Sequence, residues 1–373
     1  MIDFTSALYL GMRHAHWALP PWRQLTTGRP AALKEPPEAD RLSQDIARLL
    51  GCERAILAPS TLHLFWDLFD VLASHPIAIY VDAGTYPIAR WGVERAGARG
   101  IPLAAFPEHD PDSLETLLRR DRAGGRPPVV VTDGLCAETG RPAPLADYLT
   151  LVRKHGERLV VDDTQALGVL GTDPSDHAPY GHGGGGTPAW RGIEAPELII
   201  GSSLAKGFGA PLAVVAGAAT VISDFEKLSA TRIHCSPPSL ASIGAAQRAL
   251  AINNREGDVL RARLAKLVRH FKAGLRRVGL SAQGGLFPIQ TLKAIEGVEP
   301  EALHRRLLDL GIGALLHRSR SSRRPILSFL ITAAHTRADI GRCIDALWQV
   351  CALRGVRREI DQPMSTQMLS IPA

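Results

Sequence analysis

Short apolar runs rich in β-branched residues alternate with longer amphipathic segments between about residues 50 and 220. This alternation is typical of a parallel β-sheet covered by helices, because parallel strands need crossover connections and both faces of the sheet are then buried. The predicted strands are Arg54–Leu57, Ile77–Val81, Pro128–Thr132, Leu159–Val161, Leu198–Ile200 and Ala213–Ala216. The sequence therefore predicts an α/β domain with a mostly parallel sheet.

The pattern changes from about Leu240 onward. A long amphipathic helix is predicted over Ala241–Val278, with an interruption at Asn253–Gly257, before a smaller mixed region of strands and helices. We expect an N-terminal segment over 1–45, a large domain over 46–240, an interdomain helix with a small α+β domain over 241–355, and a tail over 356–373. The glycine-rich stretch Gly181–Gly186 is expected to be a flexible surface loop.

Composition excludes several classes of protein. Hydrophobic residues make up 45% of the chain and charged residues 21%, and no apolar run reaches about 18 residues. A globular protein is expected, without an export signal, in the cytoplasm and not in a membrane. The 5 cysteines are scattered without metal-ligand spacing, so neither a disulfide framework nor a metal site is predicted. The net charge is +6, but no basic run interleaves with aromatic residues, so no nucleic-acid partner is expected.

Lys206 lies just beyond the predicted strand Leu198–Ile200, after two serines and before glycines. Ligands collect at the carboxyl ends of strands in open parallel sheets, and small flanking residues allow a planar ligand to approach. A lysine that is desolvated there has a lowered pKa and can bond covalently to an aldehyde. Lys206 is therefore predicted to carry pyridoxal 5′-phosphate in the large domain, with Ser202 or Ser203 donating to its phosphate.

Asp162 ends another predicted strand, so its carboxylate should project from the same sheet edge as Lys206. Pyridoxal chemistry draws electrons into a protonated pyridine ring, and a carboxylate that faces the ring nitrogen keeps it protonated. Considered alone, Asp162 and Asp163 could instead be helix-cap acids.

A seat for the phosphate is predicted at Ser60, Thr61 and Leu62, ahead of the helical run Leu64–Leu72. Hydroxyl groups and free backbone amides at a helix N-terminus bind dianions. Three elements thus follow one another along the chain at the ends of predicted strands: this phosphate seat, Asp162 and Lys206. Their order supports a cofactor site.

With these residues the chain resembles the α-oxoamine synthase family of pyridoxal-phosphate enzymes of fold type I. The matching segments are Asp3–Gly11, Thr132–Leu145, Val161–Gly171, Ser203–Lys206 and Thr332–Thr336. The resemblance implies an aminotransferase-like fold with a mostly parallel seven-stranded sheet and a smaller α+β domain. It also implies a homodimer, with active sites between subunits, that joins an amino acid to an acyl thioester and releases carbon dioxide.

Three departures from the family pattern fall near the expected cofactor. Tyr86 stands where the family has a ring-stacking histidine, and tyrosine can stack but is a poorer proton donor at neutral pH. Gln165 replaces a histidine three residues after the ring aspartate, and it can still hydrogen-bond the phenolic oxygen. Ala137 replaces a serine. The resemblance implies catalytic roles for Lys206, Asp162 and Tyr86.

A fourth departure concerns the substrate. The family's arginine block, which clamps the substrate carboxylate, reads Leu327-Ser328-Phe329 here. Arg323 and Arg324 lie a few residues upstream and could serve, although a solvated basic turn is the plainer interpretation. A missing clamp implies a substrate that is held differently, or one without an α-carboxylate.

Three functions follow as hypotheses. The first is condensation of an amino acid with an acyl thioester carried on coenzyme A or a carrier protein, with Lys206 as the base. The second is transamination of an amine or amino acid, which Gln165 favours because sugar aminotransferases of this fold have a similar Asp-x-x-Gln pattern. The third is a pyridoxal-binding protein without catalysis, which the presence of both Lys206 and Asp162 disfavours.

Overall fold

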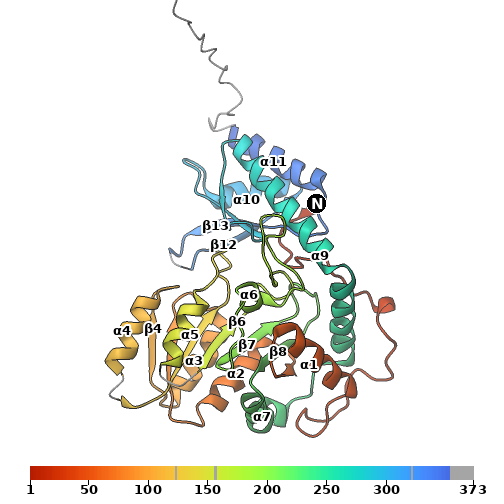
Figure 1. Ribbon diagram of the computed structural model, residues 1–373. Coiled ribbons are helices and arrows are strands. Elements are labelled where there is room, and N and C mark those ends of the chain that lie inside the picture. Colours follow the sequence, from red (N-terminus) through yellow and green to blue (C-terminus); the bar gives the residue numbers. More distant parts are fainter. Residues whose placement is uncertain (122–123, 155–157, 321, 353–373) are drawn as a thin grey trace, which may run out of the picture.

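The computed structural model describes residues 1–121, 124–154, 158–320 and 322–352. We call the part built on a seven-stranded sheet the large domain and the part built on a four-stranded sheet the small domain. The long helix α9 (Leu240–Arg277) runs from one to the other (Figure 1). The domain boundaries at 45, 240 and 355 remain predictions, and the tail over 356–373 lies outside the described residues.

The large sheet has the strand order β2-β8-β7-β6-β5-β3-β4. Its strands are β2 (Arg54–Ala58), β3 (Ala78–Asp82), β4 (Leu103–Phe106), β5 (Pro128–Asp133), β6 (Arg158–Asp162), β7 (Leu198–Ser203) and β8 (Ala213–Gly217). All neighbours pair in parallel except β8, which is antiparallel to both β2 and β7. The expected mostly parallel sheet is therefore confirmed. The sequence prediction missed β4, an edge strand whose only buried side chain is that of Phe106.

Helices cover both faces of this sheet (Figure 1). The large-domain helices are α1 (Pro37–Leu50), α2 (Thr61–Leu72), α3 (Pro87–Ala98), α4 (Pro111–Asp121), α5 (Leu145–Arg153), α6 (Gly186–Trp190), α7 (Ala219–Leu228) and α8 (Ala230–His234). Strand β5 shows the arrangement: Val129 and Val131 belong to the buried apolar cluster that includes residues of α2, α3 and α7, while Val130 belongs to the cluster that includes residues of α1, α4, α5 and α9. This alternation follows from the period of two in a β-strand, and burial on both faces explains the continuous apolar runs.

Helix α9 passes through Asn253 and Gly257 without a break, so the expected interruption is wrong. The two residues are weak helix formers, but both serve contacts. Asn253 donates from Nδ2 to Gly183 O at 2.8 Å and accepts at Oδ1 from Arg261 at 2.8 Å. A β-carbon at position 257 would lie 2.4 Å from the Asn253 Oδ1. Tertiary contacts therefore override local propensity here.

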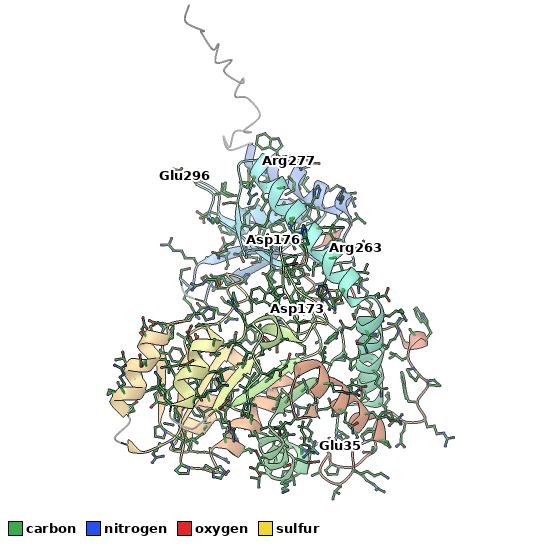
Figure 2. All side chains as sticks on the ribbon, in the orientation of Figure 1. Glu35, Asp173, Asp176, Arg263, Arg277 and Glu296 are labelled. Carbon is green, nitrogen blue, oxygen red and sulfur yellow. The ribbon has the colours of Figure 1, made fainter. Side chains whose placement is uncertain are left out.

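The glycine-rich stretch is not simply a surface loop, because Gly184, Gly185 and Gly186 are buried. A β-carbon at Gly184 would lie 2.7 Å from Arg261 Nη1, and one at Gly186 would lie 1.8 Å from Asp163 Oδ2. The close approach of other groups explains the glycines. The preceding loop, which carries Asp173 and Asp176, lies alongside α9 (Figure 2), where Arg269 donates to Asp176 O at 2.7 Å.

The small domain has an antiparallel sheet in the order β12-β13-β10-β9. Its elements are β9 (Ala282–Gln283), β10 (Ile289–Leu292), α10 (Pro300–Asp309), β11 (Ile312–Gly313), β12 (Leu315–Arg318), β13 (Pro325–Leu330) and α11 (Arg337–Ala352). The N-terminal strand β1 (Ile2–Asp3) pairs with β11 in parallel, so the start of the chain joins this domain. No helix in the described parts of the chain is long and apolar enough to cross a bilayer.

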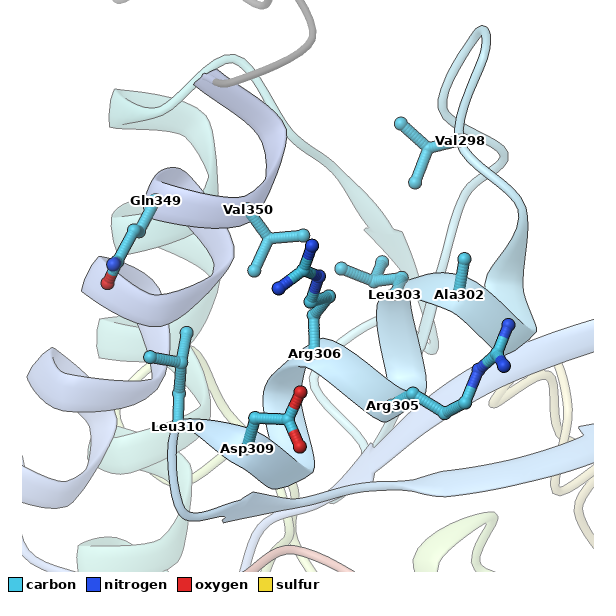
Figure 3. Close-up of a pocket in the computed structure, with 9 residues that line it drawn as sticks. All are labelled: Val298, Ala302, Leu303, Arg305, Arg306, Asp309, Leu310, Gln349 and Val350. Carbon is cyan, nitrogen blue, oxygen red and sulfur yellow. The ribbon is translucent and has the colours of Figure 1, made fainter.

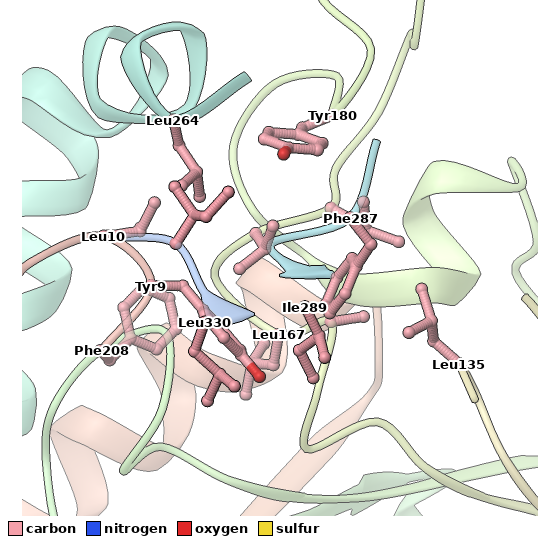
Figure 4. Packing of buried hydrophobic residues seen from close by; sticks show 14 of the residues in the cluster. Tyr9, Leu10, Leu135, Leu167, Tyr180, Phe208, Leu264, Phe287, Ile289 and Leu330 are labelled. Carbon is pink, nitrogen blue, oxygen red and sulfur yellow. The ribbon is translucent and has the colours of Figure 1, made fainter. Parts of the chain in front are cut away.

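Residues after β1 continue into the core between the two domains. Tyr9 and Leu10 pack there with Leu167 and Phe208 of the large domain and Phe287 of the small domain (Figure 4). The rings of Tyr9 and Phe287 meet edge to face at 5.7 Å. The N-terminal segment is therefore part of the structure that surrounds the sheet edge.

Candidate active site

Two aspartates end neighbouring strands at the carboxyl edge of the large sheet. Asp133 ends β5 and Asp162 ends β6, and the two residues are register partners. Lys206 follows the end of β7, the next strand. Its turn packs against the segment that follows Asp162, since a β-carbon at Gly207 would lie 2.3 Å from Leu167 O. The structure thus brings the predicted acid and the predicted lysine to one place.

Asp162 is buried, and burial raises the pKa of its carboxyl group. A hydrogen bond from Thr164 N to Oδ1 at 3.0 Å and the positive charges of Lys206 and Arg320 act in the opposite direction. Within the described residues, Oδ2 has no hydrogen-bond donor. This oxygen is free to accept a hydrogen bond from the N–H group of a protonated ring nitrogen.

Burial lowers the pKa of Lys206, and the charge of Arg320 lowers it further, while Asp162 and Asp133 raise it. The Lys206 Nζ lies over the ring of Tyr86, 5.9 Å from the centroid. Tyr86 is 43% exposed and precedes α3. Its backbone N–H donates to Asp133 Oδ1 at 2.9 Å, which fixes the tyrosine beside the sheet edge.

The predicted phosphate seat lies at the start of α2. Ser60 caps the helix, with Oγ accepting from His63 N at 3.5 Å, and Thr61 and Leu62 form the first turn. The N–H groups of a first turn have no partner within their own helix. The end of β7 lies against this turn, because a β-carbon at Gly201 would be 2.7 Å from the Phe65 ring.

Ser203 lies two residues beyond Gly201 and so projects to the same face of β7, toward α2. Its Oγ accepts a hydrogen bond from Ala205 N at 3.2 Å, and its own hydroxyl hydrogen can still be donated. Ser202 points to the opposite face, where its buried Oγ has no partner within the described residues. Ser203 is therefore better placed than Ser202 to donate to a phosphate on α2.

Gln165 lies in the turn after Asp162, half-buried. Its Oε1 accepts a 2.7 Å hydrogen bond from the hydroxyl of Tyr9, a residue that the sequence did not single out for the site. Because the oxygen is engaged, the side-chain NH2 group remains as the available donor. An NH2 donor is what a phenolic oxygen requires.

Arg320, and not Arg323 or Arg324, approaches this edge of the sheet. Its guanidinium carbon lies over Tyr86, 5.1 Å from the centroid, and Nη1 lies 3.5 Å from Asp133 Oδ2. Arg323 adopts a left-handed φ of 59° in a tight turn, where its N–H donates to Ser319 O at 3.0 Å. Arg324 lines a pocket of about 460 Å³ within the small domain. No contact in the described structure joins either residue to Lys206.

Asp133 is a third residue that the sequence prediction missed, after Tyr9 and Arg320. Burial and then the nearby Asp162 raise the pKa of Asp133 to about 8. The signal was present, because Asp133 ends a buried strand just as Asp162 does. Tyr9 and Arg320 offered no such local signal.

The segment expected to carry the arginine clamp, Leu327–Phe329, takes part in a neutral hydrogen-bond network. Ser328 is buried in β13, and its Oγ lies 2.9 Å from His317 Nε2 and 2.8 Å from Thr291 Oγ1. Burial lowers the pKa of His317, which favours the uncharged imidazole. This part of the small sheet therefore provides no permanent positive charge.

A separate pocket of about 570 Å³ lies in the small domain between α10 and the end of α11. Val298, Arg305, Arg306, Asp309 and Gln349 are among its lining residues (Figure 3). None of the residues brought together at the large-sheet edge lines it. We therefore assign it no part in the candidate active site.

The chain is similar to known proteins over most of its length. An 8-amino-7-oxononanoate synthase of Klebsiella pneumoniae is 29% identical over 93% of this chain and 88% of its own length. That of Marinobacter nauticus is 32% identical over 82% of this chain and 74% of its own.

Solved structures show the same fold. A serine palmitoyltransferase of Sphingomonas wittichii superposes with a TM-score of 0.80 at 18% identity, covering 95% of this chain and 88% of that one. The 8-amino-7-oxononanoate synthase of Francisella tularensis gives 0.71 at 19% identity, covering 95% and 98%. The family model for aminotransferase class I and II matches residues 1–347. The chain therefore belongs to the aminotransferase class I and II family of pyridoxal-phosphate enzymes and, within it, to the α-oxoamine synthases.

Proposed function

We propose that this protein is a pyridoxal-phosphate-dependent transferase that joins an amino acid to an acyl thioester. In the reaction, the α-carbon forms a bond to the acyl carbon, the carbon–sulfur bond breaks to release a thiol, and the carboxylate leaves as carbon dioxide, with one proton taken up. The observation that carries the proposal is the meeting of Lys206 and Asp162 at one sheet edge. The names of the sequence relatives support it.

The residues fit the cofactor. When bound, pyridoxal phosphate would supply a ring that accepts electrons from the α-carbon. Asp162 would hold the proton on the ring nitrogen through Oδ2, and Gln165 would donate to the phenolic oxygen through its NH2 group. The first turn of α2, at Ser60, Thr61 and Leu62, would bind the phosphate together with Ser203. Tyr86 would cover one face of the ring.

Lys206 would carry the cofactor and then move the proton at the α-carbon. A buried lysine with a lowered pKa holds a larger neutral fraction near pH 7, and the neutral amine is the form that attacks and accepts protons. Nearby charged groups adjust the neutral fraction of Lys206: Asp162 and Asp133 raise its pKa, and Arg320 lowers it.

The active protein is proposed to be a homodimer. Large apolar side chains are exposed on the neighbouring helices α2 and α3, namely Leu62, Trp66 and Trp91, together with Tyr86. A second copy would remove this surface from water and close the site. Light scattering should give twice the monomer mass, and Trp91→Glu should lower that mass. A monomeric parent protein would contradict the dimer.

A cytoplasmic location is also proposed. All five cysteines are unpaired, which suits a reducing compartment. Cell fractionation that placed the protein outside the cytoplasm would contradict this.

Transamination is the alternative, and Gln165 in place of a histidine favours it. The two reactions differ in their co-substrate. Condensation should release labelled carbon dioxide from a carboxyl-labelled amino acid only when an acyl thioester is added. Transamination should convert the bound cofactor to its pyridoxamine form without a thioester. Lys206→Ala should abolish either reaction, and no response to any amine in the parent protein would contradict both.

A further inference from the structure

A positive charge reaches the candidate active site from the small domain. Arg320 lies in the turn between β12 and β13, and its side chain is 31% exposed. Its guanidinium group lies over Tyr86, 5.1 Å from the ring centroid, and its charge acts on Lys206, Asp162 and Asp133. No family motif quoted above includes this residue.

The turn is anchored from the large domain by one side chain. Glu138, in the loop after β5, accepts from Ser319 Oγ at 2.7 Å and from the backbone N–H of Arg320 at 3.0 Å. These two bonds hold the backbone at residue 320 over the sheet edge. The direction of the Arg320 side chain is then set by Nη1, which donates to Gly84 O and approaches Asp133 Oδ2 at 3.5 Å.

One edge of the guanidinium group is unused. Within the described residues, Arg320 Nε and Nη2 make no hydrogen bond, although each can donate. The parallel N–H groups on Nε and Nη2 can donate side by side to the two oxygens of a carboxylate. The pairing with Asp133 is long, and at neutral pH that carboxyl group is mostly protonated because its pKa is raised to about 8. The charge of Arg320 is therefore only partly compensated.

Among the residues that the structure describes, Arg320 is the positively charged group whose charge acts on Lys206. The segment Leu327–Phe329, where the resemblance places the family's arginine block, has no arginine, and its Ser328 hydrogen-bonds with His317 and Thr291. Arg323 is exposed and contacts its own turn through its backbone N–H, and Arg324 lines the small-domain pocket. An amino acid that reacts at Lys206 still has an α-carboxylate one carbon away from its amine, and this group needs a cation.

We propose that Arg320 binds the α-carboxylate of the amino-acid substrate through its free Nε and Nη2 edge, with Glu138 holding the turn in place. This inference rests on the function proposed above. It makes Arg320 a specificity-determining residue that reaches the site from a turn, in place of an arginine on the strand.

The test compares amino acids with the amines that lack only the carboxylate. Glycine and methylamine, L-alanine and ethylamine, and L-serine and ethanolamine are titrated into the cofactor-loaded enzyme, and Kd is taken from the change in the visible absorption of the bound cofactor. In Arg320→Gln, we expect Kd for each amino acid to rise roughly 10- to 100-fold, the range for a bond to a charged group. Kd for the amines should change less than about 3-fold, and Arg320→Lys should be intermediate.

Control variants distinguish direct binding of the carboxylate by Arg320 from a structural role in the turn between β12 and β13. Arg318→Gln removes an exposed arginine of the same hairpin, whose guanidinium group donates to Arg323 O, and should leave both constants unchanged. Glu138→Gln should weaken amino-acid binding less than Arg320→Gln does. Thermal melting and cofactor content verify that each variant is folded and loaded.

The outcomes are distinct. Equal weakening of amino acids and amines in Arg320→Gln, or no weakening, would overturn the inference. A rise only in KM for the thioester would also overturn it and would assign Arg320 to the phosphates of that substrate. A parent enzyme that shows no cofactor absorption, or none that responds to amines, would overturn the proposed function itself.

Discussion

The hydroxyl of Tyr9 donates a 2.7 Å hydrogen bond to Oε1 of Gln165, across 156 positions of the chain. Tyr9 is fully buried between the two domains (Figure 4). Burial raises the pKa of Tyr9 well above its usual value, so the hydroxyl keeps its proton and stays a donor. The bond therefore fixes which end of the Gln165 amide faces the cofactor site.

Tyr9→Phe tests this orientation. Without the hydroxyl, the amide can rotate and present its oxygen to the phenolic oxygen, so we expect weaker cofactor binding and a shifted visible absorption maximum. Unfolding free energy should fall by about 1 kcal/mol, the cost of one hydrogen bond.

Tyr180→Phe is the matched control, because its buried hydroxyl donates to Leu286 O at 2.5 Å and does not contact Gln165. It should cost similar stability without changing the spectrum. An unchanged spectrum in Tyr9→Phe would contradict the orienting role.

Asp133 should make the stability of the cofactor-free protein depend on pH. Its pKa in the folded protein is about 8, against 3.8 for the ordinary side chain, so the folded state binds the proton more tightly. Stability from this group is present at low pH and is lost as pH rises from about 4 to 8. In urea unfolding between pH 5 and 7, the free energy of unfolding should fall less steeply with pH in Asp133→Asn than in the parent protein, by about 1 kcal/mol per pH unit. The same slope in the variant and the parent would contradict this role of Asp133.

Arg261 should be a major contributor to stability. It is 2% exposed and donates to Gly168 O and to Asn253 Oδ1, both at 2.8 Å, so it joins α9 to the segment after Asp162. Arg261→Met leaves two buried acceptors without donors and should cost ~3 kcal/mol. Arg255→Met, on the exposed side of the same helix, should change stability by less than about 0.5 kcal/mol. Similar melting temperatures for both variants would contradict the assignment.

Gly201 should control how closely α2 approaches β7. A methyl group there would lie 2.7 Å from the Phe65 ring, so Gly201→Ala should displace the first turns of α2 and weaken phosphate binding. A stability loss of about 1 to 3 kcal/mol is expected from overpacking. Gly341→Ala in α11 meets nothing within 4 Å and should be neutral or stabilising. Normal cofactor affinity in Gly201→Ala would show that the seat lies elsewhere.

The sequence alone was sufficient to predict those site residues whose position follows from a local pattern of strands. Asp162 and Lys206 follow continuous apolar strands, and parallel strands must end at one edge, so their meeting could be predicted. Arg320 could not be chosen over Arg323 and Arg324, because the choice depends on a turn held by Glu138, 182 positions earlier.

Tyr9 illustrates the same limit. Its apolar neighbours predict burial, but only the packing of the N-terminal segment between the domains brings it to Gln165. The continuity of α9 through Asn253 likewise depends on Gly183, which lies 70 positions earlier in the chain. Contacts between distant segments have no local signature.

Covalent trapping of the cofactor tests the account most directly. The protein is loaded with pyridoxal phosphate, reduced with borohydride, digested and analysed by mass spectrometry, with Lys206→Arg as the control. We predict a pyridoxyl group on the peptide that contains Lys206, and much less of it in Asp162→Asn. A label on an exposed lysine such as Lys34 or Lys227 instead, or full labelling without Asp162, would contradict the account.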